Sequence, residues 1–251
     1  MNALMMAGEF QRARSADPRR QLTGLGPVAQ LRAGHLGRRL PQLLIGLVLY
    51  GVSMVLLIRG TLGVMPWDVL HQGVTRHIPL TFGQVVIVVS VIVLLLWIPI
   101  RQKPGLGTLA NAVVIGLVVD PVLGWIEAPE GWLPRIGLLV AGLLLNGMAT
   151  AMYIGAQLGP GPRDGLMTGL ARTTGRSIRL VRTLIEVAVV AVGFALGGVL
   201  GIGTVLYALL IGPITQFMLP WFVVPLEAPG VGVVPEGPAT TTGPGADRPQ
   251  Q

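Results

Sequence analysis

The sequence predicts an all-α polytopic membrane protein with six transmembrane helices in two inverted three-helix repeats, each with a short interfacial or re-entrant helix. Three observations support this fold class: the composition, six apolar segments of spanning length, and a match of the chain to itself. Of the 251 residues 52% are hydrophobic and 12% charged, and the mean hydropathy is +0.71. Soluble domains carry about 25% charged residues, so the composition excludes an ordinary soluble enzyme.

The lengths of the apolar segments predict the individual membrane-spanning helices. A helix needs about 20 apolar residues to cross a bilayer. Six segments satisfy this requirement: Leu40–Ile58, Phe82–Ile100, Leu106–Ile126, Ile136–Leu158, Leu180–Leu200 and Gly203–Val224. With a cytoplasmic N-terminus, fifteen of the 18 basic residues fall in inner segments and only Arg59, Arg76 and Arg135 in outer ones. Because basic residues favour the cytoplasmic side, both termini are predicted to be cytoplasmic.

The two ends of the chain differ in composition from its middle. Seven arginines precede the first span, with Phe10 as the only aromatic residue among them, so we expect contact with anionic lipid headgroups and no nucleic-acid binding. A protein partner is left open. The predicted organisation is a disordered Arg-rich cytoplasmic tail (1–38), membrane repeat 1 (39–124), an outer loop (125–134), membrane repeat 2 (135–224) and a disordered Pro/Gly-rich cytoplasmic tail (225–251).

An internal repeat becomes visible when the chain is shifted by 96 residues. Residues 39–123 then align with 135–219 without a gap, and 24 of the 85 pairs are identical. Each copy contains three spans, an odd number, so the second copy enters the membrane from the opposite side. Such inverted repeats are common in transporters, where exchange of two near-equivalent conformations gives alternating access.

Each repeat has about 20 residues between its first two spans, and both connections predict a short helix. Pro66 and Asp68 in one copy align with Pro162 and Asp164 in the other. Proline suits the first helical position, and an acidic residue in the first turn complements the helix dipole. Two interpretations of the aspartates stay open: they cap these helices, or they face a central cavity as gates or ligand contacts.

The residues beside these aspartates differ between the two copies. Trp67 is most simply an interfacial anchor, whereas its counterpart Arg163 fits contact with a headgroup or a phosphate. Thr108 and Thr204 each follow a Gly-x-Gly start that includes Gly107 or Gly203, and we expect the threonines to cap the spans that follow.

These motifs resemble those of the YczE-like membrane proteins of bacteria, which are similar to the broader YitT-like membrane family. The resemblance covers about residues 39–224. Its first copy comprises Gly63, Pro66-Trp67-Asp68-Val69-Leu70-His71, Gly73 and Gly105-Leu106-Gly107-Thr108, and its second Gly159-Pro160-Gly161-Pro162-Arg163-Asp164-Gly165-Leu166-Met167 and Gly201-Ile202-Gly203-Thr204. The resemblance implies a multi-pass protein of the bacterial inner membrane and supplies no substrate or reaction.

Charged residues inside the spans are the remaining candidates for function, because a charge in the membrane costs several kcal/mol. Arg182 precedes Glu186 by four residues on one helix face. The two form either a neutralised structural pair or a site for a proton, cation or anion. Asp120 precedes Pro121 and either caps a kinked helix end or faces a wet interior, since its repeat counterpart Gln216 is also polar.

The sequence offers no catalytic or metal-ligating constellation. There is no Cys, and the three His are scattered, so we expect no enzyme activity, no metal and no cofactor. The first functional hypothesis is a small transporter or permease of unknown substrate, with a polar cavity reached by Asp68, Asp164 and Glu186. The alternative is a non-transporting accessory or structural membrane protein that docks a partner through its basic cytoplasmic face.

Overall fold

The computed structural model describes residues 26–226, and this part of the chain contains helices and no strand. The predicted tails at residues 1–25 and 227–251 lie outside the described residues. The helices are α2 (Pro27–Arg32), α3 (Leu36–Gly60), α4 (Pro66–Thr75), α5 (Phe82–Leu95), α6 (Leu106–Trp125), α7 (Trp132–Gly155), α8 (Pro162–Thr174), α9 (Ile178–Ala195) and α10 (Ile202–Phe222). The chain is therefore an all-helical protein over the part described.

Four helices, α3, α6, α7 and α10, are long and apolar enough to cross a membrane. The other two predicted spans are helices as well, but they are shorter than predicted: α5 has 14 residues and α9 has 18. Helix α5 gives way at Leu96 to a turn in which the Trp97 indole donates to the Pro162 carbonyl (3.0 Å). Helix α9 ends in a Schellman motif, in which the Gly198 N–H donates to the Gly193 carbonyl (2.8 Å) and Gly197 adopts a φ of +89°.

The two short helices predicted between the first and second spans of each repeat are present. Pro66 and Pro162 begin α4 and α8, as expected for a residue whose missing N–H is not needed at a helix start. Arg76 directly follows α4, and Arg172 lies in the last turn of α8, where a cation complements the helix dipole.

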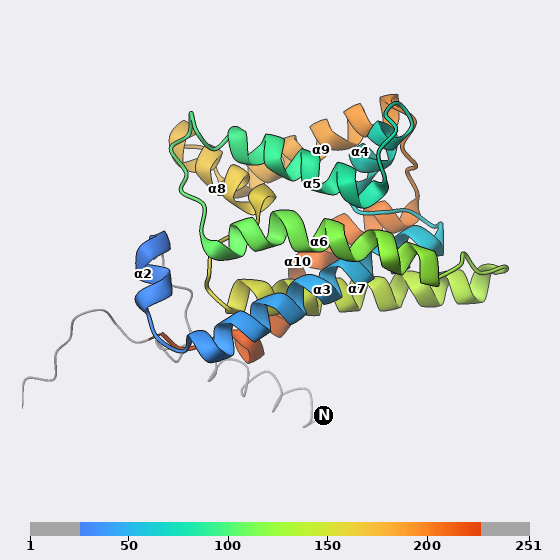
Figure 1. The fold of residues 1–251 in the computed structure, drawn as a ribbon. Helices are drawn as coiled ribbons and strands as arrows, with labels where there is room; N and C mark the ends of the chain where they lie inside the picture. Colours follow the sequence, from blue (N-terminus) through green and yellow to red (C-terminus); the bar gives the residue numbers. More distant parts are fainter. Residues whose placement is uncertain (1–25, 227–251) are drawn as a thin grey trace, which may run out of the picture.

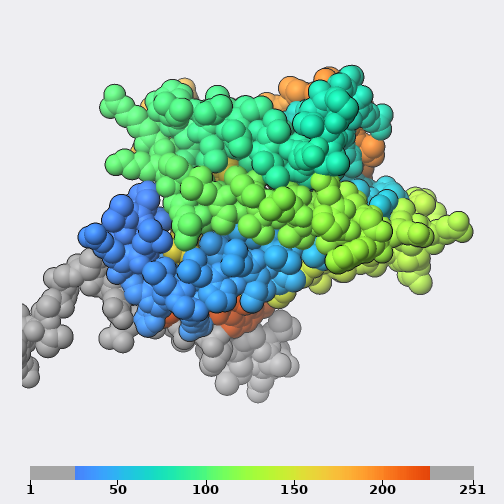
Figure 2. Space-filling model, viewed as in Figure 1, coloured from blue at the N-terminus to red at the C-terminus, as the bar shows by residue number. Residues whose placement is uncertain are grey.

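The helices form two layers (Figure 1). In one layer, α3 packs on α6 and α7, and α7 packs on α10. In the other layer, α4, α5, α8 and α9 form a closed ring in which each helix contacts the next. Each layer has its own apolar core, and α6 joins the layers through contacts with α5 and α8. Figure 2 shows one face on which α6 lies between α5 and α3.

Helices that correspond in the two repeats make equivalent contacts, but the distance between the packed helices differs. Helices α4 and α9 approach closely at Gly73 and Gly193, where an added Cβ would lie 2.5 Å from the Gly193 carbonyl oxygen and 2.4 Å from the Leu70 nitrogen. The corresponding contact between α8 and α5 is filled by Trp97, which occupies the position of Gly193 in the repeat and packs over Gly165. Glycines thus allow the close helix packing that is common in membrane proteins.

The outer surface of both layers is apolar. Exposed large side chains include Ile45 (52% exposed), Leu117 (62%), Leu184 (60%) and Leu209 (66%). Soluble monomers rarely expose large contiguous apolar patches, so these helix faces suit contact with lipid tails.

The prediction of disorder throughout residues 1–38 is wrong for its last part. Residues 27–32 form α2, and α3 begins at Leu36 rather than Leu40. The reason is Arg39, whose buried guanidinium donates to the carbonyls of Gln30 (2.6 Å) and Ala156 (2.8 Å). One side chain thus fixes the segment around α2 to the end of α7.

The contact between α4 and α9 gives a test of the fold. Gly193→Ala places a methyl group against the backbone of Leu70 and is expected to lower stability by about 1–3 kcal/mol, as over-packing usually does. The measurement is the melting temperature of the purified protein in detergent. The matched control is Gly124→Ala in α6, where an added Cβ has nothing within 4 Å. Equal melting temperatures for the two variants would contradict the packing described.

Candidate functional site

A cavity of about 280 Å3 lies between the two layers and is called the central cavity here. It is lined by residues of α3, α6, α7, α9 and α10 and by the first turns of α4 and α8. The lining is mixed: apolar side chains from α6 and α10 alternate with charged, amide and hydroxyl groups.

Both short helices begin at the central cavity. Met65, Pro66 and Trp67 line it at the start of α4, and Gly161 and Arg163 line it at the start of α8. Helix N-termini carry partial positive charge and unpaired N–H groups, so both starts favour a negatively charged or polar group in the cavity.

The segments that lead into α4 and α8 are held by two reciprocal hydrogen bonds. The Gly203 N–H donates to the Leu62 carbonyl (2.8 Å), and the Gly107 N–H donates to the Leu158 carbonyl (2.7 Å). The donors are 96 residues apart, and so are the acceptors. Each Gly-x-Gly start therefore anchors the segment that precedes the short helix of the other half of the chain.

The threonines of these motifs reinforce the anchors. Thr204 accepts from the Val64 N–H (3.1 Å), whereas Thr108 donates to the carbonyl of Pro160 (2.7 Å), because proline has no N–H to offer. Thr108 also accepts from the Gly105 N–H (3.1 Å), so its predicted capping role is confirmed. The capping role predicted for Thr204 is wrong, because α10 has no side-chain cap and the Thr204 hydroxyl instead accepts from Val64 in the segment before α4.

Four predicted site residues line the central cavity together: Arg163, Asp164, Arg182 and Glu186. The predicted intrahelical pair is confirmed, since Arg182 Nε donates to Glu186 Oε1 at 2.8 Å. Asp164 accepts a hydrogen bond from the Tyr153 hydroxyl. Within residues 26–226, Arg163 forms no ion pair with a carboxylate.

The Arg163 guanidinium instead lies over the ring of Trp67, 5.0 Å from the centroid. A cation at this distance is attracted by the π face of an aromatic ring. Trp67 and Arg163 are repeat counterparts, so the two short helices meet through their equivalent positions. Trp67 is accordingly a cavity residue in this structure.

Two of the predicted site residues lie elsewhere. Asp68 is fully buried and pairs with His71, with Oδ1 3.0 Å from Nδ1, and it does not line the cavity. Asp120 accepts from the Thr81 hydroxyl (2.5 Å) and the Gly83 N–H (2.7 Å), so it holds the start of α5 against α6. Its counterpart Gln216 does line the cavity.

Sequence reasoning missed the tyrosines. The chain has three, Tyr50, Tyr153 and Tyr207, and all of them line the central cavity. Tyr207 donates to Asn146 Oδ1 (2.7 Å), and Asn146 donates to the Ser53 hydroxyl (2.8 Å), so α10, α7 and α3 are joined by buried polar bonds. The available signal was that each tyrosine sits alone in an apolar span, where a hydroxyl needs a partner.

Comparison of the sequence with known proteins identifies its family. Residues 37–220 match a family of unknown function, DUF6198. The chain belongs to this family. It is 40% identical to an uncharacterized protein of Haemophilus influenzae over 177 residues, which cover 70% of this chain and 81% of that protein. No solved structure matches the chain.

Two Bacillus subtilis proteins are also similar to this DUF6198 chain. The uncharacterized membrane protein YczE is 33% identical and the uncharacterized protein YyaS 29% identical; the matches cover 70% of this chain and 82% and 90% of those proteins. The resemblance predicted from the motifs is thus confirmed. Together with the apolar helices, it identifies an integral membrane protein.

The threonine anchors give a test of how the site is built. Thr204→Val leaves the buried Val64 N–H without its partner and should cost about 1–3 kcal/mol. Thr204→Ser keeps the hydroxyl and should recover most of the loss. Thermal unfolding in detergent measures both, with the exposed Thr173→Val as the control that changes stability by less than about 0.5 kcal/mol. If Thr204→Val matches the control, the anchor has no energetic role.

Proposed function

We propose that this DUF6198 protein is a small transporter of the bacterial inner membrane that carries a polar solute by alternating access around the central cavity. The observation that carries the proposal is the meeting of both short helices at one cavity lined by Arg163, Asp164, Arg182 and Glu186. Charged residues inside membrane proteins commonly line ion or substrate pathways. Transporter sites are commonly built where helix N-termini of two repeats converge.

The proposed architecture is six crossings in two inverted repeats, with α5 and α9 completing the four longer helices. The reciprocal bonds from Gly107 to Leu158 and from Gly203 to Leu62 support a two-fold relation between the halves. The residues 96–100 that follow α5 as a turn are also apolar, and exposed Leu184 and Val187 give α9 a lipid-compatible face beside its charges.

The orientation belongs to the same proposal. Both termini are cytoplasmic, because fifteen basic residues then face the inside and three the outside. The Arg-rich N-terminal tail contacts anionic headgroups, which attract basic segments next to the membrane.

The cavity lining indicates the kind of solute. It offers two basic and two acidic side chains, of which Arg182 and Glu186 neutralise each other. Arg163 and Asp164 remain as one cation held by a ring and one carboxylate held by a hydroxyl. A small zwitterion pairs with both charges at once, whereas a purely anionic solute is repelled by Asp164 and a purely cationic one by Arg163.

Ligand-dependent stabilisation tests this function. The full chain in detergent is heated with a panel of small zwitterions, anions, cations and neutral polyols, and its melting temperature is recorded. A solute at 100 times its Kd stabilises the folded protein by about 2.7 kcal/mol. We expect a zwitterion to give such a shift, and Arg163→Gln and Asp164→Asn each to abolish it.

The matched controls are Arg135→Gln and Glu130→Gln, which remove the same charges outside the cavity lining and should keep the shift. A shift that survives both cavity variants places the ligand elsewhere. A panel without any stabilising solute contradicts the transporter and favours the accessory protein, whose basic face docks a partner.

A further inference from the structure

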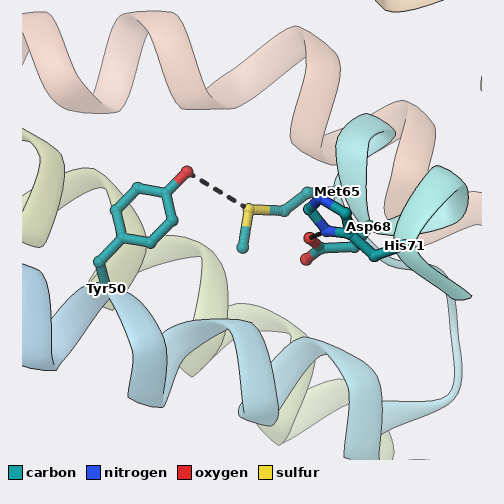
Figure 3. Close-up of polar contacts among 4 residues, drawn as sticks. All are labelled: Tyr50, Met65, Asp68 and His71. Carbon is teal, nitrogen blue, oxygen red and sulfur yellow. Dashed lines mark hydrogen bonds and ion pairs between the residues drawn. The ribbon is translucent and has the colours of Figure 1, made fainter. Parts of the chain in front are cut away.

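A second buried polar site lies behind the wall of the central cavity. Asp68 and His71 stand one turn apart on α4, and both are 0% exposed. His71 Nδ1 lies 3.0 Å from Asp68 Oδ1. Figure 3 shows the two side chains together at the start of α4, with Met65 between them and Tyr50.

The pair has two buried atoms to which no described residue offers a hydrogen bond, Asp68 Oδ2 and His71 Nε2. The surroundings are apolar: the Phe82 ring meets the imidazole edge to face with centroids 5.8 Å apart, and the backbone of Gly193 packs against the same turn of α4. A buried polar atom without a partner destabilises the folded state, so two of them on one pair indicate an exchangeable occupant.

The charge balance of the pair identifies that occupant. A carboxylate beside a neutral imidazole leaves a net negative charge on the pair in an apolar setting, which is unfavourable. With Nδ1–H donating to Asp68, both free atoms are acceptors. One proton on His71 Nε2 converts the pair into a carboxylate–imidazolium ion pair of zero net charge, and the same proton on the carboxyl group also neutralises it.

No other titratable group of the packed helices takes this role. Helix α5 carries none between Phe82 and Leu95, and α9 carries Arg179 together with the mutually paired Arg182 and Glu186. On α3 the Tyr50 hydroxyl donates to Met65 Sδ (3.8 Å). Other charged groups near the two ends of α4 are as follows: Arg163 of α8 across the Trp67 ring, and Arg76 and His77 beyond its last turn.

The pair is connected to the central cavity through its own helix. Asp68 directly follows Pro66 and Trp67, which line the cavity, and Trp67 holds the Arg163 guanidinium. The counterparts in the other half are Asp164 and Met167, so the Asp–His combination occurs once in the two repeats. A change of charge at Asp68 and His71 therefore acts on α4 and not on the equivalent helix α8.

We propose that Asp68 and His71 form a proton-binding site that couples proton movement to solute transport. The proton passes from water to His71 Nε2, the imidazolium pairs with the Asp68 carboxylate, and the same proton returns to water when the pair is opened to the other side. The coupling to transport rests on the function proposed above, whereas proton binding by the pair does not depend on it.

Nitrogen-15 NMR of histidine-labelled full-length protein tests proton binding directly. The chain has three histidines, and His71→Gln assigns the His71 signals. In the native protein the His71 signal should move from imidazolium to neutral imidazole as the pH rises, with a midpoint below that of a free imidazole because burial lowers the pKa of His71. In Asp68→Asn it should stay neutral throughout, because burial opposes an imidazolium without a carboxylate.

Two further variants complete this measurement. Asp68→Glu keeps the carboxylate and should restore the titration, and His77→Gln, which removes the histidine near the end of the same helix, should leave the His71 titration unchanged. A native His71 signal that is neutral at every pH overturns the proton site, and so does a titration that persists unchanged in Asp68→Asn.

A thiol probe tests the coupling. Because the chain has no cysteine, Thr150→Cys places a single thiol on the cavity wall. Its rate of reaction with N-ethylmaleimide, divided by the rate in the unfolded chain at the same pH, should change across the His71 titration. In the Asp68→Asn background the ratio should be constant.

The outcomes separate this proposal from the proposed function. A titrating His71 with a constant thiol ratio overturns the coupling. A zwitterion shift without a titrating His71 supports a transporter and overturns the proton site. A titrating His71 and a changing ratio, with no ligand found, support a proton site that acts on the central cavity and overturn its coupling to solute transport.

Discussion

The structure depends on the two reciprocal hydrogen bonds that tie each Gly-x-Gly start to the segment before the opposite short helix. Gly203 to Leu62 and Gly107 to Leu158 are main-chain contacts, and glycine is required because a Cβ at Gly203 or Gly107 would lie about 3 Å from the facing backbone. These bonds set where α4 and α8 begin. Without them the two helix starts would not converge, and Trp67 would not reach Arg163.

The convergence explains how charged residues are tolerated inside an apolar protein. Arg163 rests on a ring, Asp164 takes a tyrosine hydroxyl, and Arg182 and Glu186 pair with each other. Each of these contacts uses only part of the bonding capacity of the charged group, so the group can still contact a solute. Asp68 is stabilised differently: it is closed off from the cavity and pairs with His71.

Much of the fold could be predicted, because its signals are local. Apolar length predicted helices, four of which are long and apolar enough to cross a membrane, and proline with an acidic residue predicted α4 and α8. The end of α5 could not be predicted, because the apolar run continues to Ile100 and the turn depends on a bond from Trp97 to a residue 65 positions away. The end of α9 did have a signal, the Gly197–Gly198 pair, inside a run that was otherwise apolar.

The site was predicted in part for the same reason. Arg182 and Glu186 are four residues apart, so their contact follows from helix geometry. Asp68, Asp120 and Asp164 look alike in sequence, but Asp68 has its histidine partner three residues along the same helix, whereas tertiary neighbours make Asp120 a helix cap and Asp164 a part of the cavity wall. The Asp68–His71 spacing was an available local signal for that pair. The tyrosines were missed because single residues in apolar runs carry no spacing to interpret.

Two-sided thiol accessibility tests the central claim most directly. Gly212→Cys adds one thiol at the cavity lining where a Cβ has open space, and a membrane-impermeant maleimide is applied to either face of oriented vesicles. The account predicts labelling from both faces, while Gly137→Cys, exposed outside the cavity lining, is labelled from one. Labelling of Gly212→Cys from one face only, under every condition, would contradict alternating access.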